Sequence, residues 1–144
     1  MEPRATLAEL RRITNGGVAV VYNGTPMWLH QDPWARALRA VLESRLGPVA
    51  DVDFTADALR VAEHEMRDLG YVEVERWEYV HDETIDAEFV AGHILSATSS
   101  DQIPHAERED FARELSDAIA VVEPSGRVVE TVAVRAVIGR PRPR

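Results

Sequence analysis

The chain has 144 residues, of which 45% are hydrophobic and 28% are charged, and its formal charge at pH 7 is −9. These proportions are typical of globular proteins, and a chain of this length can bury the core of one domain. We therefore predict a single domain over residues 1–144, with 139–144 as a flexible tail. The negative charge argues against nucleic acid and anionic membranes as partners, because binding to them requires Lys and Arg.

The residue types also exclude several kinds of site. The chain has no cysteine, and its five histidines are scattered. Disulfides, thiolate nucleophiles and cysteine-ligated zinc are therefore excluded, and no histidine pair has the spacing of a metal site. No segment approaches the run of about 18 apolar residues that spans a membrane, and the N-terminus does not resemble a signal peptide. We predict a cytoplasmic protein without a metal.

The first third of the chain predicts a helix, a strand and a loop. Apolar residues at helical spacing predict a helix over Met1–Ile13, entered through Pro3. Asn15-Gly16-Gly17 predicts the end of this helix, with a glycine in the left-handed conformation. Val18–Tyr22 is a continuous apolar run, which is typical of an interior strand of a parallel sheet with both faces covered. The irregular segment 23–33 follows, and loops at the carboxyl ends of strands often bind ligands.

Two more helices and a strand are predicted next. Asp32-Pro33 predicts the start of a helix that ends at Gly47, and a second helix runs from about Thr55 to Leu69 and ends at Gly70. Tyr71–Glu75 alternates like a half-exposed strand, and we expect this strand to continue past a bulge through Trp77 and Tyr79. The predicted buried residues are Trp34, Leu38, Val41, Leu42 and Leu46 in the first helix and Leu59, Ala62, Met66 and Leu69 in the second.

The last third predicts two helices and a strand. One helix is expected over Thr84–Thr98 and another from Pro104, and the final strand is expected over Arg127–Ile138. The acidic residues at the start of the first helix look like a pair of catalytic carboxylates, but helix capping and the helix dipole explain them more simply. These acidic residues are Asp82, Glu83, Asp86 and Glu88.

The order and spacing of four segments resemble the second half of class I S-adenosylmethionine-dependent methyltransferases that act on small molecules. Leu7–Gly17 resembles the helix and glycine turn before the family's fifth strand, with Asn15 where proline is usual. Val18–Asn23 resembles that strand, and Met66–Val74 resembles the entry to the sixth. Asp86–Ser99 resembles the helix inserted between the last two strands, which helps to cover the substrate.

This resemblance implies an α/β fold, namely the C-terminal part of a Rossmann-like methyltransferase fold. The expected sheet is mixed and three-stranded, is flanked by helices, and has the last strand antiparallel between the other two. The family's donor-binding motifs would all precede Met1. The implied protein is a truncated methyltransferase that is inactive alone. S-adenosylmethionine would be the cofactor of the full-length family, and no cofactor is expected for this chain by itself.

The truncation has two interpretations, a start codon assigned too late or a truncated gene, because Met1-Glu2 resembles the end of a motif that precedes the first helix in the family. It would also leave Val18–Tyr22 without the family's fourth strand beside it. An apolar strand edge without Lys, Pro or inward charge is a template for pairing. We therefore expect a homodimer through this edge, a partner chain that supplies the missing half, or poor solubility.

The candidate substrate contacts come from the loop and from the covering helix. They are Trp28, His30, Trp34, His93 and Ser96. The alternative interpretation is that both tryptophans only seal the core and that His93 is a core or rim residue. No catalytic or cofactor-binding residue is predicted. The alternative function is a non-catalytic small-ligand binding module or partner domain, with a pocket between the Trp28 loop and the helix from Thr84.

Overall fold

The computed structural model describes residues 2–50 and 55–141, and the chain falls into two compact units. The first unit comprises Met1–Thr25, Asp53–His81 and Val132–Arg144, and the second comprises Pro26–Val52 and Asp82–Thr131. Both units contain helices and strand residues, so the fold is mixed α/β. The prediction of a single domain stays a prediction. None of the helices in the described part of the chain has the length and hydrophobicity needed to span a membrane.

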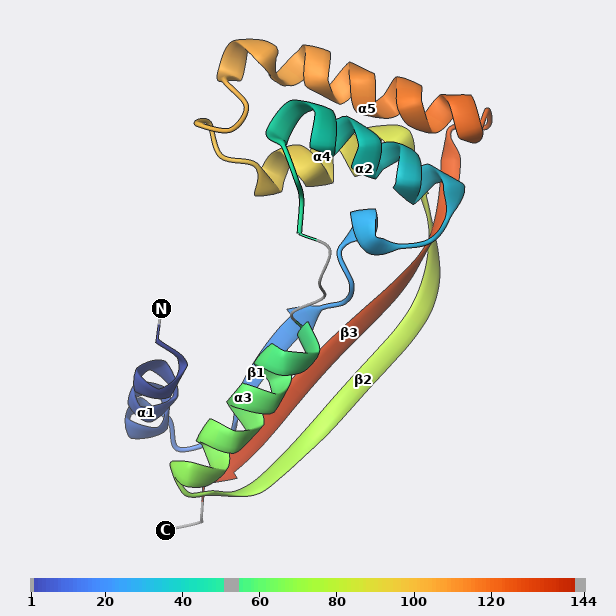
Figure 1. The fold of residues 1–144 in the computed structure, drawn as a ribbon. Helices are drawn as coiled ribbons and strands as arrows, with labels where there is room; N and C mark the ends of the chain where they lie inside the picture. The colour runs from blue at the N-terminus through green and yellow to red at the C-terminus, as the bar shows by residue number, and fades with distance from the viewer. Residues whose placement is uncertain (1, 51–54, 142–144) are drawn as a thin grey trace. The chain divides into compact units, whose positions relative to one another are not determined.

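Three strands form one sheet in the order β1-β3-β2 (Figure 1). Their bounds are Val18–Asn23 for β1, Tyr71–Asp86 for β2 and Arg127–Pro141 for β3. β1 pairs antiparallel with β3, and contacts of Arg135 with Glu78 and of Thr131 with Asp82 fit an antiparallel β2 on the other side. The predicted place of the last strand between the other two is confirmed. The predicted mixed sheet is wrong, because neighbouring strands are antiparallel throughout.

β1 lies at one edge of the sheet and buries only one of its faces. Val18 is 7% exposed, whereas Val21, on the opposite face, is 57% exposed. Val20 and Tyr22 are half-buried on the same face as Val18. The predicted interior strand of a parallel sheet with both faces covered is therefore wrong. A continuous apolar run also fits an edge strand that shows apolar side chains to solvent.

Helices α1 (Pro3–Ile13) and α3 (Thr55–Asp68) pack against each other, and α3 packs against β1 (Figure 1). The α1 helix is capped by the Glu2 carboxylate, which accepts from the backbone N–H of Ala5 at 2.8 Å. Met1, included in the prediction, lies outside the described residues. The buried core of this unit is Leu7, Val18, Leu59, Met66, Tyr71 and Val137.

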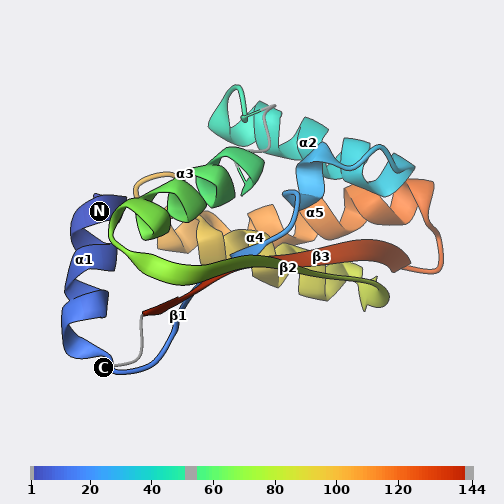
Figure 2. The ribbon, with the colours of Figure 1, turned by 90° about the horizontal axis from the view of Figure 1, so that it is seen from below.

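The second unit contains α2 (Pro33–Leu46), α4 (Ala87–Ala97) and α5 (Arg108–Val122). The α5 helix contacts both α2 and α4 (Figure 2). Two 3-10 turns, Met27–Leu29 and His105–Glu107, precede α2 and α5. The core consists of Met27, Trp34, Ala35, Leu38, Val41, Leu42, Ile85, Val90, Ala91, Ile94, Ile103, Phe111, Leu115, Ile119 and Val128.

The helix ends separate correct from wrong predictions. Gly47 and Gly70 take φ values of 79° and 81°, and both are the predicted helix stops. The predicted left-handed glycine after α1 is wrong, because the helix ends at an extended Thr14 and neither Gly16 nor Gly17 has a positive φ. A polar residue in extended conformation stops this helix instead.

Two strand boundaries also differ from the prediction. The helix expected from Thr84 starts at Ala87, because β2 runs without interruption from Tyr71 to Asp86. The last strand continues past Ile138 to Pro141, so residues 139–141 are strand and not a flexible tail. Residues 142–144 lie outside the described part of the chain.

Candidate functional site

The first three candidate substrate contacts lie in one neighbourhood of the second unit. Trp28 is half-buried, and its Nε1 donates to the backbone oxygen of Ala50 at 3.0 Å. The ring of His30 lies 6.2 Å from the ring of Trp34, tilted by 47°. Trp34 is 5% exposed and belongs to the core, and its buried Nε1 has no hydrogen-bond partner among the described residues. Both tryptophans therefore have a structural role, whatever else they contact.

The other two candidates lie on the exposed side of α4. His93 stacks on Phe89 with ring centroids 6.3 Å apart, and Phe89 is 53% exposed. The Ser96 hydroxyl donates to the backbone oxygen of His93 at 2.7 Å. These contacts stay within α4, so His93 and Ser96 form a group separate from the Trp28 loop. A role of all five residues in substrate binding stays a prediction.

The acidic residues before α4 have structural partners. Asp86 is the N-cap of α4, and its carboxylate accepts from the backbone N–H of Phe89 at 2.7 Å. The Asp82 carboxylate accepts from the Thr131 hydroxyl, also at 2.7 Å. Asp86 thus caps the helix as expected. In the described part of the chain, no three His, Asp or Glu side chains gather closely enough to hold a metal ion.

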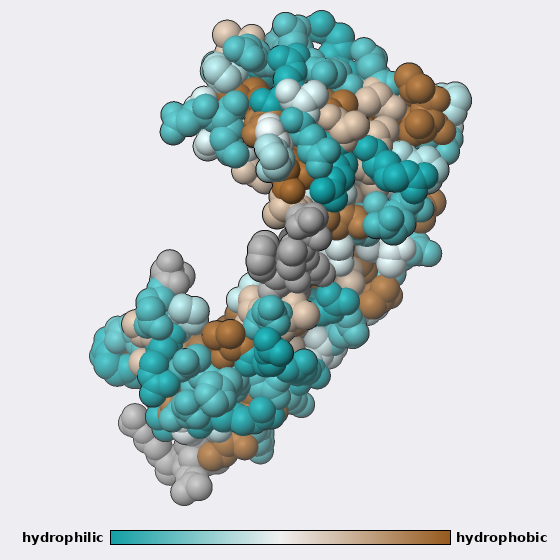
Figure 3. All heavy atoms as spheres, in the orientation of Figure 1, coloured by the Kyte–Doolittle hydropathy of each residue, from teal (hydrophilic) through white to brown (hydrophobic). Residues whose placement is uncertain are grey.

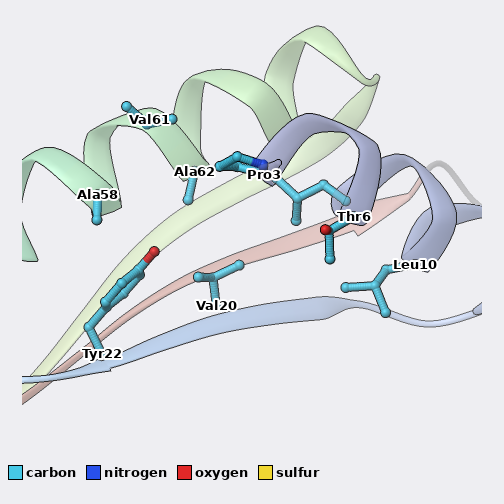
Figure 4. A pocket seen from close by; sticks show the side chains of 9 residues that line it. Pro3, Thr6, Leu10, Val20, Tyr22, Ala58, Val61 and Ala62 are labelled. Carbon is cyan, nitrogen blue, oxygen red and sulfur yellow. The ribbon is translucent and has the colours of Figure 1, made fainter. Parts of the chain in front are cut away.

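The first unit contains a cavity of about 430 Å³ that the sequence did not predict (Figure 4). Val20 and Tyr22 point into it from β1, and α1 and α3 provide the two sides. Small-molecule pockets have similar volumes, roughly 300–1,000 Å³, and are mostly apolar. The nine lining residues are Pro3, Thr6, Leu7, Leu10, Val20, Tyr22, Ala58, Val61 and Ala62. We call this cavity the α1–α3 groove.

No charged side chain lines the α1–α3 groove, and its polar groups are two hydroxyls. The Thr6 hydroxyl already donates to the backbone oxygen of Glu2 at 3.1 Å. The Tyr22 hydroxyl makes no hydrogen bond within residues 2–50 and 55–141, so it can bond to an added group. Hydrophobic atoms reach the surface beside α3 in Figure 3. The arrangement therefore suits an uncharged, mostly apolar surface or molecule.

A second cavity, of about 450 Å³, lies between α2 and α5 in the second unit and is lined mainly by ion pairs. Arg45 bonds to Glu114 at 2.7 Å, and Arg113 bonds to Asp110 at 3.0 Å. The bond to Glu114 is the main reason why the pKa of Arg45 is raised above its ordinary value. Because these charges neutralise one another, we assign no ligand to this cavity.

A row of rings lies along one face of β2. Trp77 stacks on Tyr79 with centroids 6.1 Å apart, and Tyr79 stacks on His81 at 5.1 Å. Trp77 is 48% exposed and Tyr79 is 53% exposed. Residues two apart on a strand share a face, so this row follows from the spacing of the three residues in the sequence. This row of stacked rings distinguishes β2 from β1, whose single aromatic residue is Tyr22.

Sequence reasoning missed the α1–α3 groove, although one signal was present. Ala58 and Ala62 are four residues apart, so they share a helix face and leave space above β1. Neither of the two cavities described above is lined by Trp28, His30, His93 or Ser96. The predicted pocket beside the Trp28 loop therefore coincides with neither of them. No protein-family model matches the chain, and no curated protein matches it either.

Proposed function

We propose that the chain is the C-terminal half of a class I S-adenosylmethionine-dependent methyltransferase of small molecules and is inactive without the half that binds the methyl donor. The strand order is the observation that carries the proposal. Consecutive strands are usually neighbours, so three strands in a simple meander would give the order β1-β2-β3. The observed order places the last strand in the middle, antiparallel to β1, and this central position is the one that the resemblance gives to the last strand.

The order of the helices gives further support. One helix precedes β1, two lie between β1 and β2, and two lie between β2 and β3. The long connection from β1 to β2 suits strands that run in the same direction, because such strands need a crossover. The four segments that carry the resemblance fall on α1, on β1, on the end of α3 with the start of β2, and on α4.

Methyl transfer from a sulfonium depends mainly on the alignment and desolvation of the two reactants. In the proposed enzyme the missing half holds the donor, and this chain contributes the substrate side. Trp28 and His30 from the loop and His93 and Ser96 from α4 are the proposed contacts, with Trp34 supporting the loop from the core. The acceptor is a small molecule and not a nucleic acid, since the chain carries a charge of −9.

The test restores the missing half. The N-terminal part of a small-molecule methyltransferase, through its fourth strand, is joined in front of Met1, and S-adenosylmethionine is titrated by calorimetry into this protein and into the chain alone. We expect a 1:1 isotherm for the joined protein and none at micromolar donor for the chain alone. Binding by the chain alone, or no binding by a joined protein with native-like circular dichroism, would contradict the proposal.

A second candidate is a non-catalytic small-ligand binding module, and the α1–α3 groove is the observation that favours it. The probe is indole, an uncharged molecule with one donor, titrated while amide shifts are followed by NMR. Saturable shifts at Val20 and Tyr22 that are lost in Ala58→Leu would support this function, because leucine fills the groove. The Ala120→Leu variant, on the exposed side of α5, is the control.

A further inference from the structure

The two edges of the sheet are protected to different degrees. Within the described residues β1 is bonded to β3 alone, so the backbone groups along its other side have no strand partner. The β1 strand contains no Lys, Arg, Asp, Glu or Pro. The edge strand β2 instead carries charged side chains along most of its length and the aromatic row. Charged side chains on edge strands prevent pairing with other chains, so β1 is the open edge.

The α1–α3 groove adjoins this open edge. Figure 4 shows β1 in front, with Val20 and Tyr22 directed toward α1 and α3 above it. A strand added beside β1 would place every second side chain on the helix side of the sheet, next to the groove. The added strand would also place the remaining side chains beside Val21, which is 57% exposed. Backbone pairing and apolar burial would thus occur at the same site, as in β-strand addition.

We propose that two copies of the chain form a dimer by antiparallel pairing of their β1 strands, with the two α1–α3 grooves packed side by side. When two copies pair in this way about a two-fold axis perpendicular to the sheets, the helices of both copies lie on the same side of the combined sheet. The residues that line each groove carry no charge, so contact between the two grooves does not bury an ionised group of their lining. Every copy has one β1 edge, so the assembly closes at two chains and does not grow into a fibre.

Charge and size set the expected strength of the dimer. Stable interfaces use about 20–30 residues on each side, which is more than β1 and the nine groove residues provide. We therefore expect a dissociation constant in the micromolar range. Each copy carries a charge of −9, so the copies repel each other at long range, and salt screens this repulsion. Dimerisation should become tighter as salt is raised.

The test is sedimentation equilibrium of the full chain from about 1 to 100 μM at low and at physiological salt. We expect a monomer–dimer equilibrium that is several-fold tighter at the higher salt. Hydrogen exchange at both ends of the concentration range gives a second measurement. Amides within Ala19–Tyr22 should gain protection at the higher concentration, because edge groups become paired.

Variants locate the interface. Val21→Lys places a charge on the exposed face of β1 and should weaken dimerisation at least tenfold, although it lowers the net repulsion between copies. Ala58→Glu places a charge in the groove and should have a similar effect. The matched controls are Val80→Lys on β2, where Val80 is 52% exposed, and Ala120→Glu on α5. Both controls should leave the dissociation constant unchanged.

A strictly monomeric chain at 100 μM would overturn the proposal, as would a dimer that only Val80→Lys dissociates. Circular dichroism of each variant separates loss of pairing from loss of folding. The inference concerns the chain by itself and does not depend on the proposed methyltransferase function. If that function holds, the joined protein should not dimerise through β1, because the fourth strand of the added half would pair with this edge. If the chain alone dimerises and the joined protein does not bind the donor, the dimer proposal stands and the proposed methyltransferase function is refuted.

Discussion

Glu63 connects α3 to β2 through its two carboxylate oxygens. One oxygen contacts Nη2 of Arg67 at 2.6 Å, one turn later in α3, and the other accepts from Nε of Arg76 at 2.6 Å on β2. The side chain is 15% exposed. The hydrogen bond to Arg76 is the largest cause that lowers the pKa of Glu63, burial opposes it, and Arg67 lowers it further.

Because the pKa of Glu63 is lowered in the folded chain, the free energy of unfolding depends on pH, and the direction of the shift gives the sign of this dependence. The unfolded chain binds the proton at higher pH than the folded chain does, so Glu63 stabilises the fold at neutral pH. The contribution is lost as the pH falls from the ordinary carboxyl range through the lower folded pKa. We expect Glu63→Gln to cost on the order of 1 kcal/mol at pH 7 and clearly less at pH 3, measured by urea denaturation.

The control for Glu63 is Glu9→Gln. The pKa of Glu9 is also lowered, by a side-chain hydrogen bond with Arg12, but this pair is exposed and weakened by solvent. Its replacement should hardly change the stability at either pH. An equal pH response in wild type and Glu63→Gln would show that the bridge between α3 and β2 does not form in solution.

Gly139 is required by the close approach of β3 to two buried side chains. A Cβ atom at this position would lie 2.8 Å from Sδ of Met66 and 3.0 Å from Cδ1 of Tyr71. Met66 is fully buried and Tyr71 is 4% exposed, so neither can move freely. We expect Gly139→Ala to destabilise the protein by about 1–3 kcal/mol in urea denaturation, as overpacked cores do.

The control for Gly139→Ala is Gly16→Ala. A Cβ at Gly16 meets no atom within 4 Å, and its φ is not positive. Its stability should therefore stay within about 0.5 kcal/mol of the wild type. If Gly139→Ala were equally neutral, β3 would have to lie farther from Met66 than the structure places it.

At the scale of elements, α4 contains a glycine that weakens it. Gly92 lies in the middle of Ala87–Ala97, is exposed, and would place a Cβ with no atom within 4 Å. Glycine in a helix interior costs roughly 0.5–1 kcal/mol relative to alanine. We expect Gly92→Ala to raise the stability by this amount in thermal or urea denaturation.

The reverse change, Ala120→Gly in α5, should lower the stability by a similar amount, because Ala120 is also exposed on a helix. A loss of stability in Gly92→Ala would mean that another chain or segment packs closely on the exposed side of α4. This is also the side that carries His93 and Ser96.

Residues that restrict the backbone made several element boundaries predictable. Pro33 starts α2, and Gly47 and Gly70 follow α2 and α3 with positive φ. The boundary between β2 and α4 was not predictable in this way. Ile85 has a spacing that fits a helix with Phe89, yet pairing with β3 extends the strand to Asp86. Pairing partners lie far away in the sequence, so a local pattern does not contain them.

The candidate site was predictable only in part for the same reason. The burial of Trp34 follows from its place in the helical stripe with Leu38 and Leu42. The α1–α3 groove also depends on the separation between the two helices, which the spacing of Ala58 and Ala62 does not give. Val18–Tyr22 shows a further limit, since a run of apolar residues does not reveal how many of its faces are covered.

At the scale of the whole molecule, most of the buried hydrophobic residues in the described part of the chain form two clusters, one in each compact unit. The sequence contains no linker between these units, because each is assembled from segments that alternate along the chain. The prediction of a single domain was based on the absence of an interior linker, and segments that alternate between two units in this way leave no such linker in the sequence. Long-range contacts, not local composition, define the two units.

The alternation of segments has a consequence for anyone who wishes to shorten the protein. β3 supplies Val128 to one cluster and Val137 to the other, so deletion of this strand removes buried side chains from both. No single stretch of the gene encodes either unit completely, since the chain passes between them after Thr25, Val52, His81 and Thr131. Expression of a minimal fragment would therefore require circular permutation or new linkers. A single protease cut cannot release one unit intact from the other.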